Sequence, residues 1–158
     1  MSKAKPTESV SDSKQVAGFI AKFDPAIAKL TRACRTAIRK RYPSAIELVY
    51  DNYNALAIGY SSTERTSDCV FSLAVYARGV NLYFMYGRSL PDPDELLLGN
   101  GSQGAFIRLD SASTLDQPRV KKLIESAVKR QIPTFSSSGR GYTVVKSISA
   151  KQRPRRSQ

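Results

Sequence analysis

Histidine is absent from the 158 residues of this chain. Without an imidazole, Ser-His-Asp and Cys-His nucleophilic sites, histidine metal sites and a histidine general base are all excluded. Cysteine is scarce, since only Cys34 and Cys69 occur, and they lack the CxxC spacing of a redox or zinc motif. We expect both to be buried thiols rather than partners in a disulfide.

Long apolar runs are also missing. The longest stretch, from Cys69 to Tyr76, is interrupted by Ser72 and is much shorter than the ~20 residues of a membrane helix. The N-terminal segment carries lysines but lacks the apolar core of a secretory signal. These absences predict a cytoplasmic protein without a membrane partner, and no motif predicts a bound cofactor or metal.

Acidic residues are few: 13 Asp and Glu stand against 25 Lys and Arg, giving a net charge of +12. Residues 134–158 carry half of that net charge, because they hold six basic residues and no acid. A mobile basic cluster can approach phosphates without a fitted groove. The tail therefore predicts weak, sequence-independent nucleic-acid binding through Arg153, Arg155 and Arg156, with a merely solubilising tail as the alternative.

A second basic feature lies in the predicted helix after Asp24. Arg32, Arg35 and Arg39 are spaced i, i+3, i+7 and share one helical face. Such a stripe can hold phosphates. A charged, solvated outer face explains it equally well.

Apolar periodicity predicts helices at both ends of a run of strands. Residues 1–12 lack periodicity and predict a disordered leader. Val16, Phe19, Ile20 and Phe23 follow at helical spacing. A second helix should start after the N-cap Asp24, with Pro25 at its first position, and stop before Pro43. Its predicted buried stripe is Ile27, Leu30, Cys34, Ala37 and Ile38.

Alternating apolar residues then predict strands joined by hairpins. The expected strands are 46–50, 56–60, 69–76, 80–86 and 105–110, with a helical turn at 96–98, a last helix opened by Asp116 and ended by Pro133, and a further candidate strand at 142–148. This order predicts an α+β fold in which an antiparallel sheet of about five to six strands is covered by the N- and C-terminal helices. We divide the chain into the leader, one domain at 13–149 and a disordered basic tail at 150–158.

The first predicted strand and its turn have the most unusual local composition. Tyrosine, asparagine and carboxylate side chains gather there without a lysine. If they converge at the end of the sheet, they form a hydrogen-bonding recess with aromatic walls. Ordinary turn chemistry with core tyrosines is the alternative. The candidate ligand-binding residues are Glu47, Tyr50, Asp51, Asn52, Tyr53 and Asn54.

A glycine-rich segment at 99–104 matches G-x-G-x-x-G. The dinucleotide fingerprint needs a strand before it and a helix after it, and here a strand follows instead. Free N–H groups of Gly99 and Gly101 can still hold a small anion, with Arg88 and Arg108 as charge partners. A plain glycine-rich turn is the alternative.

Acidic residues are densest at Asp92, Asp94 and Glu95. Hard cations need several converging oxygens, and three carboxylates around two prolines fall short of that. We expect Asp94 and Glu95 to complement the dipole of the turn at 96–98.

The order of several segments resembles the YdhG-like family, a bacterial domain of unknown function. The segments are 47–56, 80–84, Leu90-Pro91-Asp92-Pro93, the glycine loop, the strand at 106–109 and Leu115-Asp116, with 146–149 similar to one subgroup. The resemblance covers about residues 14–132 and implies a frataxin-like α+β sandwich. One branch of the family is regarded as a frataxin-like iron chaperone. Frataxins bind iron through an acidic first helix, whereas the corresponding helix here is basic.

We therefore predict a non-enzymatic binding or accessory protein. Its expected surface is the turn at 50–54 beside the glycine loop, receiving a small ligand or a polar segment of a protein partner. An iron chaperone is the alternative, with weak oxygen ligands at Asp92, Asp94, Glu95, Glu47 and Asp51. An enzyme would need Glu47, Asp51 or a desolvated lysine as general base. The sequence leaves the ligand and the oligomeric state open.

Overall fold

The computed structural model describes residues 4–157, and their side chains from residue 12 onward. This part of the chain forms three α-helices and six strands in an α+β arrangement. The strands are β1 (Ile46–Asp51), β2 (Leu56–Ser61), β3 (Cys69–Tyr76), β4 (Gly79–Phe84), β5 (Ala105–Leu109) and β6 (Thr143–Ile148). The helices are α1 (Ala4–Ala21), α2 (Pro25–Arg41) and α3 (Pro118–Arg130).

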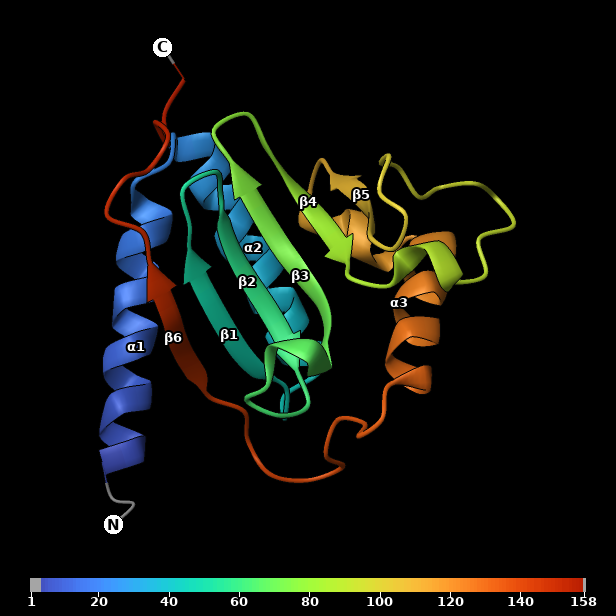
Figure 1. Cartoon of the computed structure of the whole chain (residues 1–158), viewed down its shortest axis with the longest axis horizontal. Helices are drawn as coiled ribbons and strands as arrows, with labels where there is room; N and C mark the ends of the chain where they lie inside the picture. The colour runs from blue at the N-terminus through green and yellow to red at the C-terminus, as the bar shows by residue number, and fades with distance from the viewer. Residues whose placement is uncertain (1–3, 158) are drawn as a thin grey trace.

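The strands form one sheet in the order β5-β4-β3-β2-β1-β6. Four neighbouring pairs are antiparallel, but β6 pairs with β1 in parallel. The prediction of a purely antiparallel sheet is therefore wrong, and the sheet is mixed. A parallel neighbour needs a long connection instead of a hairpin, and the chain from α3 to β6 runs past the end of the sheet in Figure 1.

Helix α1 starts within the predicted disordered leader, of which residues 1–3 lie outside the described residues. The leader prediction differs from the structure because α1 packs along β6. The carboxylate of Asp12 accepts a hydrogen bond from the backbone N–H of Val145 at 3.0 Å. Val16 and Ile20 are buried. Contacts with a strand more than a hundred residues away are invisible to local periodicity.

The other helices follow the predicted positions closely. Pro25 takes the first turn of α2, as predicted, although the carboxylate of Asp24 makes no capping bond. The Asp24 carboxylate instead accepts a hydrogen bond from the backbone N–H of Ser157. The last helix begins at Pro118 rather than Asp116, which belongs to the preceding 3₁₀ turn η3 (Ala112–Asp116). No helix within residues 4–157 is both long and apolar enough to cross a membrane.

A single apolar core lies between the helices and one face of the sheet. Tyr60, Phe71 and Phe84 are its largest sheet side chains. Cys34 and Cys69 are both free and buried, as predicted. In Figure 1 the helices lie behind the sheet or along its edge, and no α-helix covers the front of β2 to β5, although the glycine loop packs against Tyr83 and Phe106 at this front. We call this front the open face.

The prediction of a helical turn at 96–98 is wrong. Leu98 pairs with Phe106 as an isolated β-bridge. The carboxylate of Asp92 accepts the N–H groups of Leu96 and Leu97, each at 2.9 Å. This bonding organises a loop instead of a helix end.

Candidate functional site

Glu47, predicted as a ligand-binding residue, lies inside a buried network. Its side chain faces the helices, and the residue is 1% exposed. Arg35 donates to both carboxylate oxygens at 2.9 Å. Tyr60 and Thr143 add hydroxyl donors at 2.8 Å each. The carboxylate is therefore fully occupied by the protein itself.

The pKa values in this network follow from burial and charge. Burial alone would raise the pKa of Glu47, but the hydrogen bonds and charge of Arg35 outweigh it, so the pKa lies below its ordinary value. Burial and the neighbouring carboxylate raise the pKa of Tyr60 well above its ordinary value. Glu47 is thus an ionised structural acid, and the geometry gives no support to its role as a general base.

Asp51 is occupied in the same way at the other end of β1. Lys22 donates to one of its oxygens at 2.7 Å and Arg155 to the other at 2.9 Å. Burial acts to raise its pKa, and the hydrogen bonds of Lys22, Gln152 and Arg155 lower it below its ordinary value. Asp51 binds the C-terminal segment of its own chain.

The C-terminal segment is therefore not the mobile tail that the sequence predicted. Arg155 is buried, because it also donates to the carbonyl of Asn52. Arg153 lies over the ring of Tyr53, and Arg156 is 3.8 Å from the carboxylate of Asp24. The three C-terminal arginines predicted to bind nucleic acid therefore all contact the folded domain.

The turn after β1 does not form the predicted recess beside the glycine loop. Three strands separate β1 from β5, which is roughly 19 Å at about 4.8 Å per strand. Asp51 aligns across the sheet with Leu109, at the end of β5 opposite the glycine loop. Within the turn, the oxygen of Asn52 accepts from Ser147, Tyr50 bonds to Thr66, and Tyr53 and Asn54 are exposed.

The glycine loop binds Arg88 through its carbonyl oxygens. The Arg88 guanidinium donates to Gly99 and Gly101, so the loop is organised around a cation and not around an anion. Two glycines allow close approach to aromatic rings. A Cβ at Gly99, whose φ is +113°, would lie 3.2 Å from the Phe106 ring, and one at Gly104 would lie 1.9 Å from the Tyr83 hydroxyl.

Tyr83 and Phe106 are direct neighbours on the open face. They pair across β4 and β5. Tyr83 is 37% exposed and Phe106 is half-buried. The next strand offers small side chains, because Ser72 pairs with Tyr83 and Gly59 with Ser72. Two aromatic rings thus border a shallow floor.

A polar row runs beside this aromatic pair. Asn81 pairs with Arg108, and Ala74 pairs with Asn81. The Oδ1 of Asn81 is buried and has no hydrogen-bond partner among the residues described. Arg108 is exposed, as is Arg78 in the hairpin between β3 and β4. Arg108 is a predicted site residue whose side chain is exposed on this face.

Tyr83, Phe106 and Asn81 were not among the site residues predicted from the sequence. The signal was present, since Val80, Leu82 and Phe84 alternate with Asn81 and Tyr83 along β4, and strand alternation sends such sets to opposite faces. On α2, Arg35 is committed to Glu47, while Arg32 and Arg39 remain exposed. The predicted arginine stripe is thus partly a structural element.

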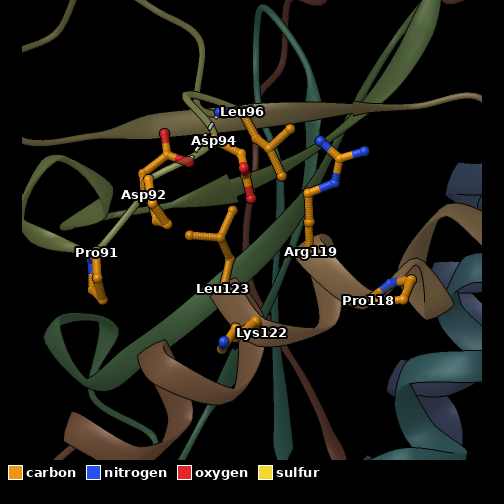
Figure 2. A pocket seen from close by; sticks show the side chains of 9 residues that line it. Pro91, Asp92, Asp94, Leu96, Pro118, Arg119, Lys122 and Leu123 are labelled. Atoms are coloured by element: carbon orange, nitrogen blue, oxygen red, sulfur yellow. Dashed lines mark hydrogen bonds between the residues drawn. The ribbon is translucent and has the colours of Figure 1, made fainter.

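The acidic loop faces α3 across a cavity of about 210 Å³ (Figure 2). Asp92 and Asp94 lie on the loop side, and Arg119 and Lys122 rise from the helix. Asp92 is already bound to backbone N–H groups. Within the residues described, no group of three or more His, Cys, Asp or Glu is placed to hold a metal.

Comparison of the chain with protein-family models, curated proteins and solved structures gives no match. The resemblance to the YdhG-like family, the frataxin-like fold and the iron-chaperone alternative stay predictions. The open face is a surface on which two partly exposed aromatic side chains lie beside the exposed Arg108.

Proposed function

We propose that this protein is a non-enzymatic, single-stranded nucleic-acid binding protein and that the open face is its binding surface. The observation that carries the proposal is the neighbouring pair of Tyr83 and Phe106, flanked by the exposed Arg108. Aromatic rings on a sheet give bases a stacking surface, and each stacked base contributes about 1–3 kcal/mol without sequence preference. Arginine adds phosphate contacts and cation–π contacts.

A single strand suits this surface better than a duplex. In a duplex the base faces are stacked inside the helix, so aromatic side chains on a flat sheet cannot reach them. Ala57, Ser72 and Ala74 are small, half-buried residues on the two neighbouring strands, so no large side chain stands beside the aromatic pair on that side.

Charge supports the same partner. The chain carries +12 overall. Arg78 precedes β4, Arg108 lies on β5, and Arg88 lies beyond the other end of β4, where its guanidinium also donates to the carbonyls of Gly99 and Gly101. If three phosphates are neutralised, the log–log salt slope is about −2, from roughly −0.7 per phosphate on single strands. The proposal moves nucleic-acid contact from the C-terminal segment, where Arg155 is buried, to the open face.

Fluorescence anisotropy with labelled 12-nucleotide oligo(dT) and oligo(rU) tests the proposal. The double variant Tyr83→Ala, Phe106→Ala should weaken binding by at least about fivefold, which is one stacked base at the lower limit. Tyr53→Ala is the matched control, because Tyr53 is an exposed tyrosine on the turn between β1 and β2. Absence of oligonucleotide binding at low salt, or equal losses in both variants, would overturn the proposal.

A further inference from the structure

A second cavity lies where α2 ends, away from the aromatic pair of the open face. It has a volume of about 350 Å³, at the lower end of the roughly 300–1,000 Å³ of small-ligand pockets. Three of its lining side chains are cationic and none is acidic. Its lining residues are Arg39, Lys40, Tyr42, Pro43, Ala45, Gly139, Arg140 and Gly141.

The wall that carries Arg140 is fixed by its flanking glycines. Gly139 has a φ of +87°, a conformation that favours glycine. A Cβ at Gly141 would lie 1.8 Å from the carbonyl oxygen of Ala45, so only glycine fits there. The N–H of Gly141 donates to the carbonyl of Pro43 at 2.7 Å. The Gly-Arg-Gly segment therefore places Arg140 opposite the end of α2.

The loop before this segment is anchored as well. Ser44 donates its hydroxyl to the carbonyl of Ser136 at 2.7 Å. Ser136 in turn bonds to both the carbonyl and the N–H of Ser138. The cavity is thus bounded by a loop with defined hydrogen bonds on both sides of Arg140.

One of the three cations around the cavity has a carboxylate partner within the described part of the chain. Arg39 forms an ion pair with Glu47 at 3.7 Å, a distance too long for a hydrogen bond. Both oxygens of Glu47 already accept from Arg35, Tyr60 and Thr143. The end of the α2 dipole contributes about half a negative charge here, against Lys40, Arg140 and an Arg39 that shares the single carboxylate of Glu47 with Arg35. The balance favours an anion.

We propose that this cavity binds the phosphate groups of a small di- or polyphosphate, such as pyrophosphate or the phosphates of a nucleotide. Arginine presents a planar fork of donors that matches phosphate oxygens in pairs. Arg39 and Arg140 would approach the anion from opposite walls, and Lys40 would add a point charge. This site is independent of the single-strand surface and goes beyond the function proposed for it.

Isothermal titration of the full chain with sodium pyrophosphate, with inorganic phosphate and ATP as parallel ligands, tests the site. One pyrophosphate should bind per chain, and Arg140→Ala should weaken binding by about tenfold or more, since one charge-assisted contact is lost. The pyrophosphate affinity of Arg140→Lys should lie between those of wild type and Arg140→Ala, because lysine keeps the positive charge but lacks the planar donor pair of the guanidinium. Arg119→Ala, an exposed arginine on α3, should change nothing.

The oligonucleotide titration separates the two sources of phosphate. Arg140→Ala should leave oligonucleotide affinity within about twofold, as expected for a site apart from the nucleic-acid surface. Equal losses for pyrophosphate and oligonucleotide would instead make the cavity a backbone contact of the nucleic-acid site and overturn this proposal. Absence of saturable pyrophosphate binding, or identical binding by wild type and Arg140→Ala, would overturn it as well.

Discussion

The two faces of the sheet use polar residues in opposite ways. On the helix-covered face, Glu47 and Asp51 are buried and bound by Arg35, Lys22 and Arg155. On the open face, Arg108 is exposed and the Oδ1 of Asn81 has no partner within the described part of the chain. Charged side chains on one face are therefore committed to folding, while Arg108 on the other remains accessible to a ligand.

Breaking the Glu47 network should give the largest effect on stability. Glu47→Ala leaves Arg35 without its carboxylate in a half-buried position, and removing one partner of a buried pair costs about 3–5 kcal/mol. Urea unfolding should show that loss. Asp110→Asn, an exposed acid beside β5, is the control and should stay within about 0.5 kcal/mol. If Glu47→Ala lowered the free energy of unfolding by less than about 1 kcal/mol, the hydrogen bonds of Glu47 would not be a major source of stability.

The second largest effect should come from the C-terminal segment. Arg155→Ala removes one donor from Asp51 but leaves Lys22, so the expected loss is about 1.5–3 kcal/mol, as for a hydrogen bond to a charged group. Arg153→Ala should cost less than about 1 kcal/mol, because that side chain is exposed and only stacks on Tyr53. Equal costs for the two would show that the segment is a loose tail, as the sequence alone predicted.

Acid should lower the free energy of unfolding by protonating carboxylates on the helix-covered face. Glu47 and Asp51 have pKa values below their ordinary range. Between the lowered folded values and the ordinary values near pH 4, the unfolded state binds more protons, so stability falls as pH falls through that window. Each unit of pKa difference is worth about 1.4 kcal/mol. Unfolding between pH 6 and pH 2.5 should show a smaller acid slope for Glu47→Gln than for wild type, and equal slopes would contradict the assignment.

The smallest expected effect on stability concerns the open face. Gly104→Ala places a Cβ where the Tyr83 hydroxyl now lies. Because Tyr83 is partly exposed, its ring can move at a cost of under about 1 kcal/mol. The displaced ring should weaken oligonucleotide binding a few-fold by anisotropy. Ser102→Ala, an exposed residue of the same loop, should bind like wild type, and a matching loss there would contradict the role of Tyr83.

Much of the sheet could be predicted because its signal is local. Alternation predicted β3 with its observed bounds and placed the hairpin between β3 and β4. The parallel position of β6 could not be predicted, since its partner β1 lies almost a hundred residues earlier and no hairpin turn joins the two.

The predicted site failed for a related reason. Charged residues in a strand indicate a solvent-facing side, yet Glu47 and Asp51 face the core. Their partners make that burial possible, and Arg155 is 104 residues away from Asp51 in the sequence. No residue close to Asp51 in the sequence indicates that a distant arginine will form an ion pair with it. Arg108 was found because its basic character is local, while Tyr83 and Phe106 were interpreted as ordinary strand residues.

Amide chemical-shift mapping with oligo(dT) tests the division between the two faces most directly. Titration of the ¹⁵N-labelled chain should shift the amides around Asn81, Tyr83, Phe106 and Arg108 and leave those of α1 and the C-terminal segment in place. Shifts that concentrate on Arg153 to Arg156 or along the α2 arginines, with the open face unchanged, would contradict the account.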